Sequence, residues 1–350
     1  MFHNSMKKIL FSATTLVAVI SLVLAGCGDD NDSESASSTE KPLIVVTTNI
    51  LGDVVTNMVG DSFDVETIMP PGSDPHDFQA SAQQVQTMMS ADLLIVNGAN
   101  FEEGMLDVIE NAESDGVMIF EAISVVSQLE GSDDHGHGDH DDHEGHDDHE
   151  GHDDHKGHDD HEGHDDHEGH DHGGIDPHFF TDPARMAVVA QELSEFLVTN
   201  FPDVDQEFVS TANDYVKQLQ ALDSEVEQTL SAISSGERLL VTNHAVFAYF
   251  ADRYSFTVLG EIIPSSSTLA SASAQQLASL AEEIKENQVK AIFADASSSD
   301  ALAQTLADEV SGVEVINLYT ESLGDPGSAG ESYIDMIRFN AEAIASALAG

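Results

Sequence analysis

The chain alternates between short apolar runs and longer stretches in which apolar residues recur every three or four positions. The runs are rich in β-branched residues and predict strands, whereas the periodic stretches predict amphipathic helices. The predicted strands are residues 43–48, 63–69, 93–97, 117–121, 239–242, 256–262, 291–294 and 313–318. The predicted helices are residues 49–59, 81–90, 182–204, about 205–233, 275–287, 301–310 and 332–348. Strands and helices alternate in both halves, which predicts an α/β fold with mainly parallel sheets.

The pattern divides the folded part of the chain into two (β/α) lobes. We expect an N-terminal lobe over residues 42–181 and a C-terminal lobe over residues 205–350. A long helix over residues 182–204 joins them, and Pro183 suits its first turn because the missing N–H would have no partner there.

Three polar residues follow predicted strands closely: His76, His244 and Glu321. In open α/β sheets, ligands bind at the carboxyl ends of the strands. We therefore expect these three side chains to face one cleft between the lobes.

The first 26 residues predict a bacterial lipoprotein signal peptide, with two lysines, an apolar stretch over residues 9–24 and small residues just before Cys27. The stretch is short for a membrane span and is flanked as a secretory signal is. Cleavage leaves Cys27 as the lipid-bearing first residue; the alternative is an uncleaved anchor with a buried cysteine. Residues 27–41 are polar and predict a flexible tether. We expect the mature chain outside the cytoplasm, in the periplasm or at the cell surface, anchored to a bacterial membrane.

A second polar segment, residues 131–174, is built largely from a six-residue repeat of His, Asp, Glu and Gly. It lacks apolar side chains and cannot pack a core, so we expect a disordered insert in the N-terminal lobe. Imidazole and carboxylate groups together bind Zn²⁺, Ni²⁺, Cu²⁺ or Co²⁺ loosely. This predicts metal handling; the alternative is a solvated spacer. The repeats supply the weak candidate ligands His140, His143, His146, His149, His152, His155, His158, His161, His164 and His167.

Composition excludes several classes of partner and site. The chain has 65 acidic and 11 basic residues and a net charge of −54. This charge argues against nucleic acid, whose phosphates attract the opposite sign, and against docking on an anionic membrane surface. The single Cys excludes an intramolecular disulfide and a Cys-rich zinc site. Of the 18 His, 14 lie in the insert and one in the signal peptide, so three remain in the lobes.

These three are His76, His178 and His244, and three imidazoles are good ligands for Zn²⁺. The first two each end the tripeptide Asp-Pro-His, in which the proline stiffens the turn. Asp74 and Asp176 are candidate acceptors for the ring N–H groups; alternatively, they only shape their turns. Any single His is more often a structural residue, but the repeated tripeptide favours a metal site.

Longer motifs surround these residues. They are Gly-Ser-Asp-Pro-His-Asp-Phe-Gln at 72–79, Ala-Asp-Leu-Leu-Ile-Val-Asn-Gly at 91–98, Asp-Pro-His-Phe-Phe-Thr-Asp-Pro at 176–183, Asn-His-Ala-Val-Phe-Ala-Tyr-Phe at 243–250, and Leu323-Gly324 followed by Tyr333 and Asn340. With the lipobox, these motifs resemble those of the zinc- or manganese-binding solute-binding lipoproteins of ABC importers, of the ZnuA/TroA type (cluster A-I). The resemblance covers the mature chain apart from the tether and the insert.

The resemblance implies two lobes joined by a rigid helix, with a metal ion buried in the cleft between them. It implies that His76, His178 and His244 are metal ligands. The fourth ligand of the family, where present, is an Asp shortly before Leu-Gly. Glu321 stands at or near that place in this sequence, and its longer side chain changes the reach. Asp325 and water are the alternatives for the fourth position.

The resemblance also implies a cargo and partners. A His at the third position is similar to zinc-binding members, whereas manganese-binding members tend to have a carboxylate there. Nitrogen-rich ligation favours Zn²⁺ over Mn²⁺, so Zn²⁺ is the expected ligand and Mn²⁺ the runner-up. The expected partners are an ABC permease and its ATPase, and the protein is expected to act as a monomer that catalyses no reaction. The acidic insert resembles that of zinc members and is expected to capture or deliver zinc.

Two other classes of function are weaker. Three His with an open position could activate water in a zinc hydrolase, but the sequence lacks His-Glu-x-x-His, Gly-x-Ser-x-Gly and a Gly-rich phosphate loop. A surface zinc buffer or adhesin would act mainly through the His-rich insert and would need no permease.

Overall fold

The structure is a computed structural model that describes residues 41–131 and 174–349. The predicted signal peptide with Cys27, most of the tether and the His-rich repeats lie outside the described residues. Within the described ranges, no helix is long and apolar enough to cross a membrane.

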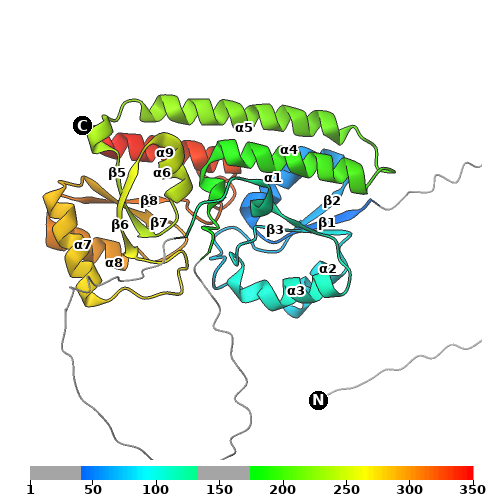
Figure 1. Ribbon diagram of the computed structural model, residues 1–350, viewed down its shortest axis with the longest axis horizontal. Coiled ribbons are helices and arrows are strands. Elements are labelled where there is room, and N and C mark those ends of the chain that lie inside the picture. The colour runs from blue at the N-terminus through cyan, green and yellow to red at the C-terminus, as the bar shows by residue number, and fades with distance from the viewer. Residues whose placement is uncertain (1–40, 132–173, 350) are drawn as a thin grey trace, which may run out of the picture. The chain divides into compact units, whose positions relative to one another are not determined.

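The N-terminal lobe is a parallel sheet with helices on both faces (Figure 1). Its strands are β1 (Leu43–Val46), β2 (Asp64–Thr67), β3 (Leu93–Val96) and β4 (Ile119–Glu121). They pair in the order β2-β1-β3-β4, all parallel. Its helices are α1 (Asn49–Val59), α2 (Ala82–Met89) and α3 (Leu106–Ser114). The predicted elements are present here within a few residues. The short helix α3, in which only Ala112 is buried, was not predicted.

The C-terminal lobe repeats this arrangement. Its strands are β5 (Leu239–His244), β6 (Thr257–Ile263), β7 (Ala291–Asp295) and β8 (Glu314–Leu318), and its helices are α6 (Ala248–Tyr254), α7 (Ala274–Glu286), α8 (Ala301–Val310) and α9 (Tyr333–Leu348). The strands pair in the order β6-β5-β7-β8, again all parallel. The two parallel sheets confirm the predicted fold class.

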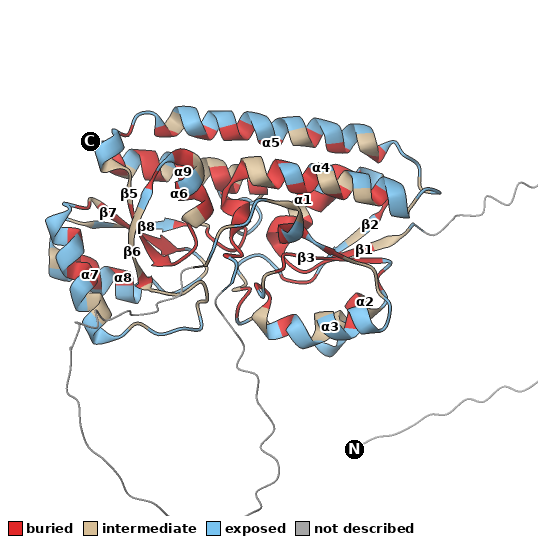
Figure 2. Cartoon of the chain, in the orientation of Figure 1, coloured by how far each residue is buried: buried red, intermediate tan, exposed pale blue. Residues whose placement is uncertain are grey.

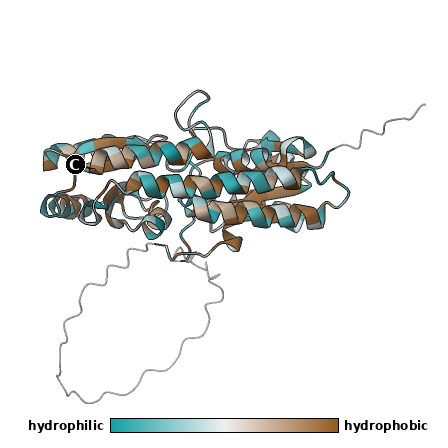
Figure 3. Ribbon diagram, turned by 90° about the horizontal axis from the view of Figure 1, so that it is seen from above, coloured by the Kyte–Doolittle hydropathy of each residue, from teal (hydrophilic) through white to brown (hydrophobic). Residues whose placement is uncertain are grey.

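Two long helices lie across the sheets, α4 (Pro183–Asn200) and α5 (Phe208–Leu230). Asp182 caps α4, because its side chain accepts the backbone N–H groups of Ala184 and Arg185. Helix α5 packs against α4, against α1 of the first lobe and against α9 of the second. In Figure 3, hydrophilic and hydrophobic residues alternate along the long helices, as expected for helices buried on one face only.

A continuous apolar core connects the lobes. It contains residues of both sheets and of α1, α4, α5 and α9, including Ile44, Leu193, Leu219, Phe293 and Tyr333. Figure 2 shows that the central strands of the two sheets are buried, whereas the edge strands β2, β6 and β8 and the outer face of α5 are partly exposed. Both faces of each sheet are covered, as is usual for parallel sheets. The loops at the carboxyl ends of the strands are therefore held by a rigid scaffold.

Candidate metal centre

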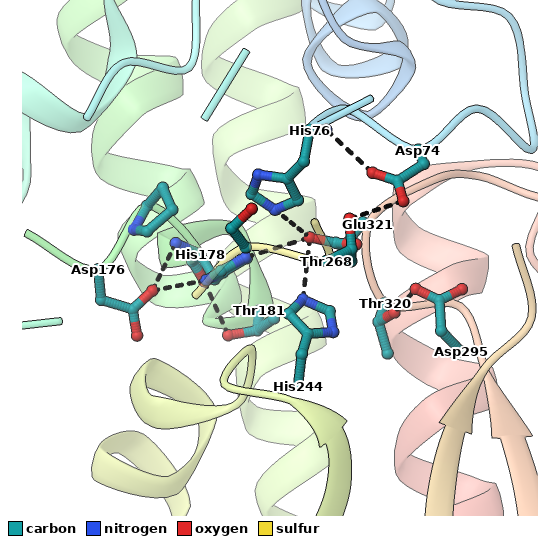
Figure 4. Close-up of polar contacts among 12 residues, drawn as sticks. Asp74, His76, Asp176, His178, Thr181, His244, Thr268, Asp295, Thr320 and Glu321 are labelled. Carbon is teal, nitrogen blue, oxygen red and sulfur yellow. Dashed lines mark hydrogen bonds and ion pairs between the residues drawn. The ribbon is translucent and has the colours of Figure 1, made fainter. Parts of the chain in front are cut away.

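Four predicted side chains meet where the two lobes face each other. His76 lies in the loop after β2, His178 directly before a 3₁₀ turn that leads into α4, His244 at the end of β5, and Glu321 in the loop after β8. Each offers one ligand atom, and these atoms all lie within 4.8 Å of one another. All four residues are buried. Figure 4 shows the three imidazoles pointing toward the Glu321 carboxylate.

The imidazoles surround a single oxygen. Glu321 Oε1 lies 2.8 Å from Nε2 of His76, 3.2 Å from Nε2 of His178 and 3.0 Å from Nε2 of His244. His244 Nε2 is close to this oxygen but not aligned for a hydrogen bond, and among the described residues His244 Nδ1 and Glu321 Oε2 are also buried without a hydrogen bond. Buried polar atoms normally have partners. Three convergent imidazole nitrogens and a carboxylate with a free oxygen form a donor set that suits a tetrahedral Zn²⁺ ion.

The turn Asp176-Pro177-His178 explains how one ligand is oriented. Asp176 Oδ1 accepts the backbone N–H of His178 at 2.9 Å and lies 2.7 Å from its ring Nδ1. A proton on Nδ1 then leaves the lone pair on Nε2, which faces Glu321. Of the two roles left open for Asp176, the structure shows contact with both the ring and the backbone of His178.

In the turn Asp74-Pro75-His76, a different residue contacts the histidine ring. Asp74 Oδ1 accepts the backbone N–H of His76 at 2.9 Å, while its Oδ2 accepts a hydrogen bond from Thr268 at 2.7 Å. The carboxylate on the His76 ring is Glu103, whose Oε1 lies 3.0 Å from Nδ1. In the structure, Asp74 shapes the turn rather than contacting the ring. Glu103 could not be identified from the sequence, because no spacing relative to His76 marks a residue from the turn after β3.

The cluster has strong electrostatic coupling. Burial opposes protonation of His76, but the negative charge of Glu321 and the hydrogen bond to Glu103 outweigh it and raise the pKa of His76 to about 10. Burial likewise opposes the charged form of His178, and the neighbouring Asp176 raises the pKa of its ring. Burial disfavours the charge on Glu321, yet His244 and His76 hold the pKa of its carboxyl well below the usual range. The carboxylates therefore stabilise positive charge on the imidazoles, and the same negative charge could stabilise a bound cation.

Glu321 and Asp325, the two candidates for the fourth ligand, are placed differently. Glu321 is 2% exposed and belongs to the cluster, whereas Asp325 is exposed and does not. A second buried carboxylate, Asp295 at the end of β7, accepts hydrogen bonds from Ser297 at 2.6 Å and from Thr320. It supports the loop that carries Glu321.

Aromatic residues exclude water from one side of the cluster. The Phe101 ring contacts the His76 ring edge-on, with centroids 5.1 Å apart, and the His178 ring at 5.5 Å. Phe101 is itself 1% exposed. Low local polarity strengthens any interaction between a cation and these ligands.

Comparison with known proteins gives concordant matches. The family model described as "Zinc-uptake complex component A periplasmic" matches residues 44–347. The chain is 26% identical to the manganese-binding lipoprotein MntA of Halalkalibacterium halodurans, over 98% of this chain and 99% of that protein. It is also 26% identical to the metal ABC transporter substrate-binding lipoprotein SsaB of Streptococcus sanguinis, over 98% of this chain and 100% of that protein. Among solved structures, the periplasmic zinc binding protein TroA from Treponema pallidum matches with a TM-score of 0.71 and 26% identity, over 89% of this chain and 100% of that chain.

Proposed function

Because the chain belongs to the zinc-uptake complex component A family, the solute-binding proteins of metal ABC importers, we propose that it captures Zn²⁺ outside the cytoplasm and delivers it to an ABC permease. The ligands in this proposal are His76, His178, His244 and Glu321. The observation that carries it is the buried convergence of three imidazole nitrogens and one carboxylate. The cargo is bound and released, and no reaction is catalysed.

The choice of zinc rests on ligand chemistry. Imidazole suits Zn²⁺, Mn²⁺ prefers oxygen ligands, and Zn²⁺ stands above Mn²⁺ in general affinity. Manganese is the second candidate, since relatives such as MntA are named as manganese-binding lipoproteins, while TroA is named as zinc-binding. The names of the relatives therefore support either metal as the cargo. The set of three nitrogen donors and one oxygen donor favours zinc.

The proposal includes the remaining parts of the chain. Residues 1–26 act as the signal peptide, and Cys27 carries the lipid that anchors the tether over 27–41. The permease and its ATPase are the partners. One chain supplies all four ligands, which supports a monomer. The His-rich repeats of residues 131–174 add weak zinc sites; in a surface buffer or adhesin they would instead carry the whole function.

The structure offers a way to separate the two kinds of site. Gly131 N–H donates to the Gly174 carbonyl at 3.4 Å, and Glu130 pairs with Ile175 in an antiparallel bridge. Because the ends of the insert lie together, residues 133–172 can be deleted and the chain closed with a short linker. We expect the deletion to remove the weak zinc equivalents and leave one tight site.

Anaerobic competition titration of the deleted protein with Zn²⁺ and Mn²⁺ tests the assignment. We expect one tight zinc site that is lost in His76→Ala, His178→Ala and His244→Ala. Glu321→Ala should weaken it, and Asp325→Ala, the matched control from the same loop, should not. A tight preference for Mn²⁺ would refute the zinc assignment. Loss of the tight site on deletion would refute the division of roles.

A further inference from the structure

The loop that carries Glu321 is attached to both lobes. Directly before Glu321, the Thr320 hydroxyl donates a hydrogen bond to Asp295 at the end of β7, in the C-terminal lobe. Two residues after Glu321, the Leu323 backbone N–H donates to Oδ1 of Asn49 at 2.8 Å, in the N-terminal lobe. The carboxylate that faces the three imidazoles is therefore held between anchors on opposite lobes.

Asn49, the first residue of α1, uses its whole carboxamide at this junction. Besides the oxygen described above, its Nδ2 donates to the Pro70 carbonyl at 3.0 Å and to Ser322 Oγ at 2.9 Å. Pro70 belongs to the loop that leads to His76, and Ser322 follows Glu321 directly. One side chain thus fixes the loops of two candidate ligands relative to each other.

Burial strengthens this connection. Asn49 is 7% exposed, Ser322 2% and Leu323 5%. The Gly72 N–H, from the loop that contains His76, adds hydrogen bonds to Ser322 Oγ at 2.8 Å and to the Leu323 carbonyl at 3.2 Å. Water cannot easily replace these partners, so breaking the contacts leaves buried polar groups unpaired, at a cost for each.

The shared core limits other ways of opening the site. The main apolar cluster runs through both lobes by way of α4, α5 and α9. Large apolar interfaces oppose relative motion of domains, whereas loops with few apolar contacts open more easily. The shared core therefore favours local separation of the two ligand loops over movement of whole lobes as the way to open the site.

We propose that Asn49 is a positioning residue that sets the rate at which the bound metal ion leaves the site. Its carboxamide keeps the His76 loop and the Glu321 loop together, and these hydrogen bonds must break before the ion can escape. The inference rests on the proposed function, since it requires the ion to bind at this cluster.

The test is zinc release from the full-length protein into excess chromogenic chelator, followed by stopped-flow absorbance. Weak sites empty in a fast phase. The slow phase that His244→Ala abolishes reports the tight site. We expect Asn49→Ala to accelerate the slow phase about tenfold or more, because three hydrogen bonds are lost. Ser322→Ala, which preserves Asn49, should accelerate it by a smaller factor.

Two comparisons separate this role from general destabilisation. Leu193→Ala removes core packing in α4 but none of the hydrogen bonds between the two loops, and should lower the melting temperature of the metal-free protein while leaving the slow rate within about twofold of wild type. In the double variant Asn49→Ala/Ser322→Ala, the acceleration on a logarithmic scale should be smaller than the sum of the two single effects, because both substitutions remove the hydrogen bond between Asn49 and Ser322. The Gly72 contact with Ser322 is lost only with Ser322→Ala, so the double variant should still be faster than Asn49→Ala alone.

The other possible results contradict either the role of Asn49 alone or the proposed function as well. If the slow phase exists, depends on His244 and is unchanged in Asn49→Ala, the role of Asn49 is overturned while the proposed function stands. Additive effects of Asn49→Ala and Ser322→Ala on the logarithm of the rate also overturn it, as does equal acceleration in Leu193→Ala. Absence of any His244-dependent slow phase in the wild type overturns the proposed function and this inference with it.

Discussion

Zinc binding should release protons from the candidate site, even at a pH where ordinary histidines are already neutral. In the metal-free protein, the pKa of His76 is raised to about 10. Metal ligation requires the neutral imidazole, so the ion must displace the proton that the Glu321 carboxylate now stabilises. The experiment adds Zn²⁺ at a pH of about 8, because an ordinary histidine with a pKa of about 6.5 has already lost its proton there.

The magnitude follows from the same contacts. At a pH of about 8, His76 is almost fully protonated, so at least about one proton leaves for each tightly bound ion. Burial lowers the pKa of the neighbouring His178, but Asp176 outweighs this effect and raises it. A proton on His178 can therefore add to the number of protons released. Zinc affinity should rise about tenfold for each pH unit until His76 titrates.

The stability of the metal-free protein should follow the opposite trend. A raised pKa in the folded state means that protonated His76 stabilises the fold most fully below about pH 6.5, the unfolded value. This contribution is lost as the pH rises toward about 10. Zinc affinity and metal-free stability should therefore change in opposite directions over the same interval.

Isothermal titration calorimetry measures the proton count directly. The heat of zinc binding at a pH of about 8 is recorded in buffers with different ionisation enthalpies, and the slope gives the protons released per ion. The measurement uses the protein from which residues 133–172 are deleted, so that the His-rich repeats do not contribute to the count. Glu103→Gln should shift the release to lower pH, since it removes one cause of the raised pKa. A slope near zero for the tight site would refute the coupling between Glu321 and His76.

Three further predictions follow from other contacts. Asp176→Asn should weaken tight zinc binding about 10- to 100-fold, measured by competition titration, since it disturbs the carboxylate on the His178 ring; unchanged affinity would contradict the orienting role. Leu193→Ala should lower the free energy of unfolding by about 2–5 kcal/mol in denaturant titration, because the side chain is 1% exposed; a loss below about 1 kcal/mol would contradict its place in the core. Lower salt should reduce the melting temperature, since a net charge of −54 repels itself; a salt-independent midpoint would contradict this.

The sequence predicts most elements of this fold because apolar periodicity and burial agree. Runs such as Leu93–Val96 are buried on every residue, as a central parallel strand requires. The predicted helices that form, such as residues 49–59, have a clear apolar face. Helix α3 (Leu106–Ser114) was missed because most of its residues are exposed and only Ala112 is buried, so no apolar face marks it. The position of α5 across both lobes could not be predicted either, because it depends on contacts with α1 and α9.

The candidate ligands differ in how well sequence can identify them. His76 and His178 stand in rigid Asp-Pro-His turns, and the local sequence forms the backbone contact at each. Their ring partners diverge nonetheless, since Asp176 contacts the ring of His178 while the ring of His76 contacts Glu103. A tripeptide determines its own turn, but the acceptor for a ring nitrogen can come from any segment that packs nearby.

The fourth candidate shows where local sequence is insufficient. Glu321 and Asp325 lie in one loop, and no local pattern shows which of them faces the histidines. The outcome depends on Asn49, 274 residues before Leu323, whose carboxamide oxygen accepts the Leu323 N–H. With Leu323 fixed to one lobe and Thr320 to the other, the intervening Glu321 is directed toward the imidazoles, whereas Asp325 lies beyond the anchor and is exposed. The same long-range hydrogen bonds that select Glu321 are those we propose must break for the ion to leave. In this proposal, one set of contacts both positions Glu321 and controls release of the ion.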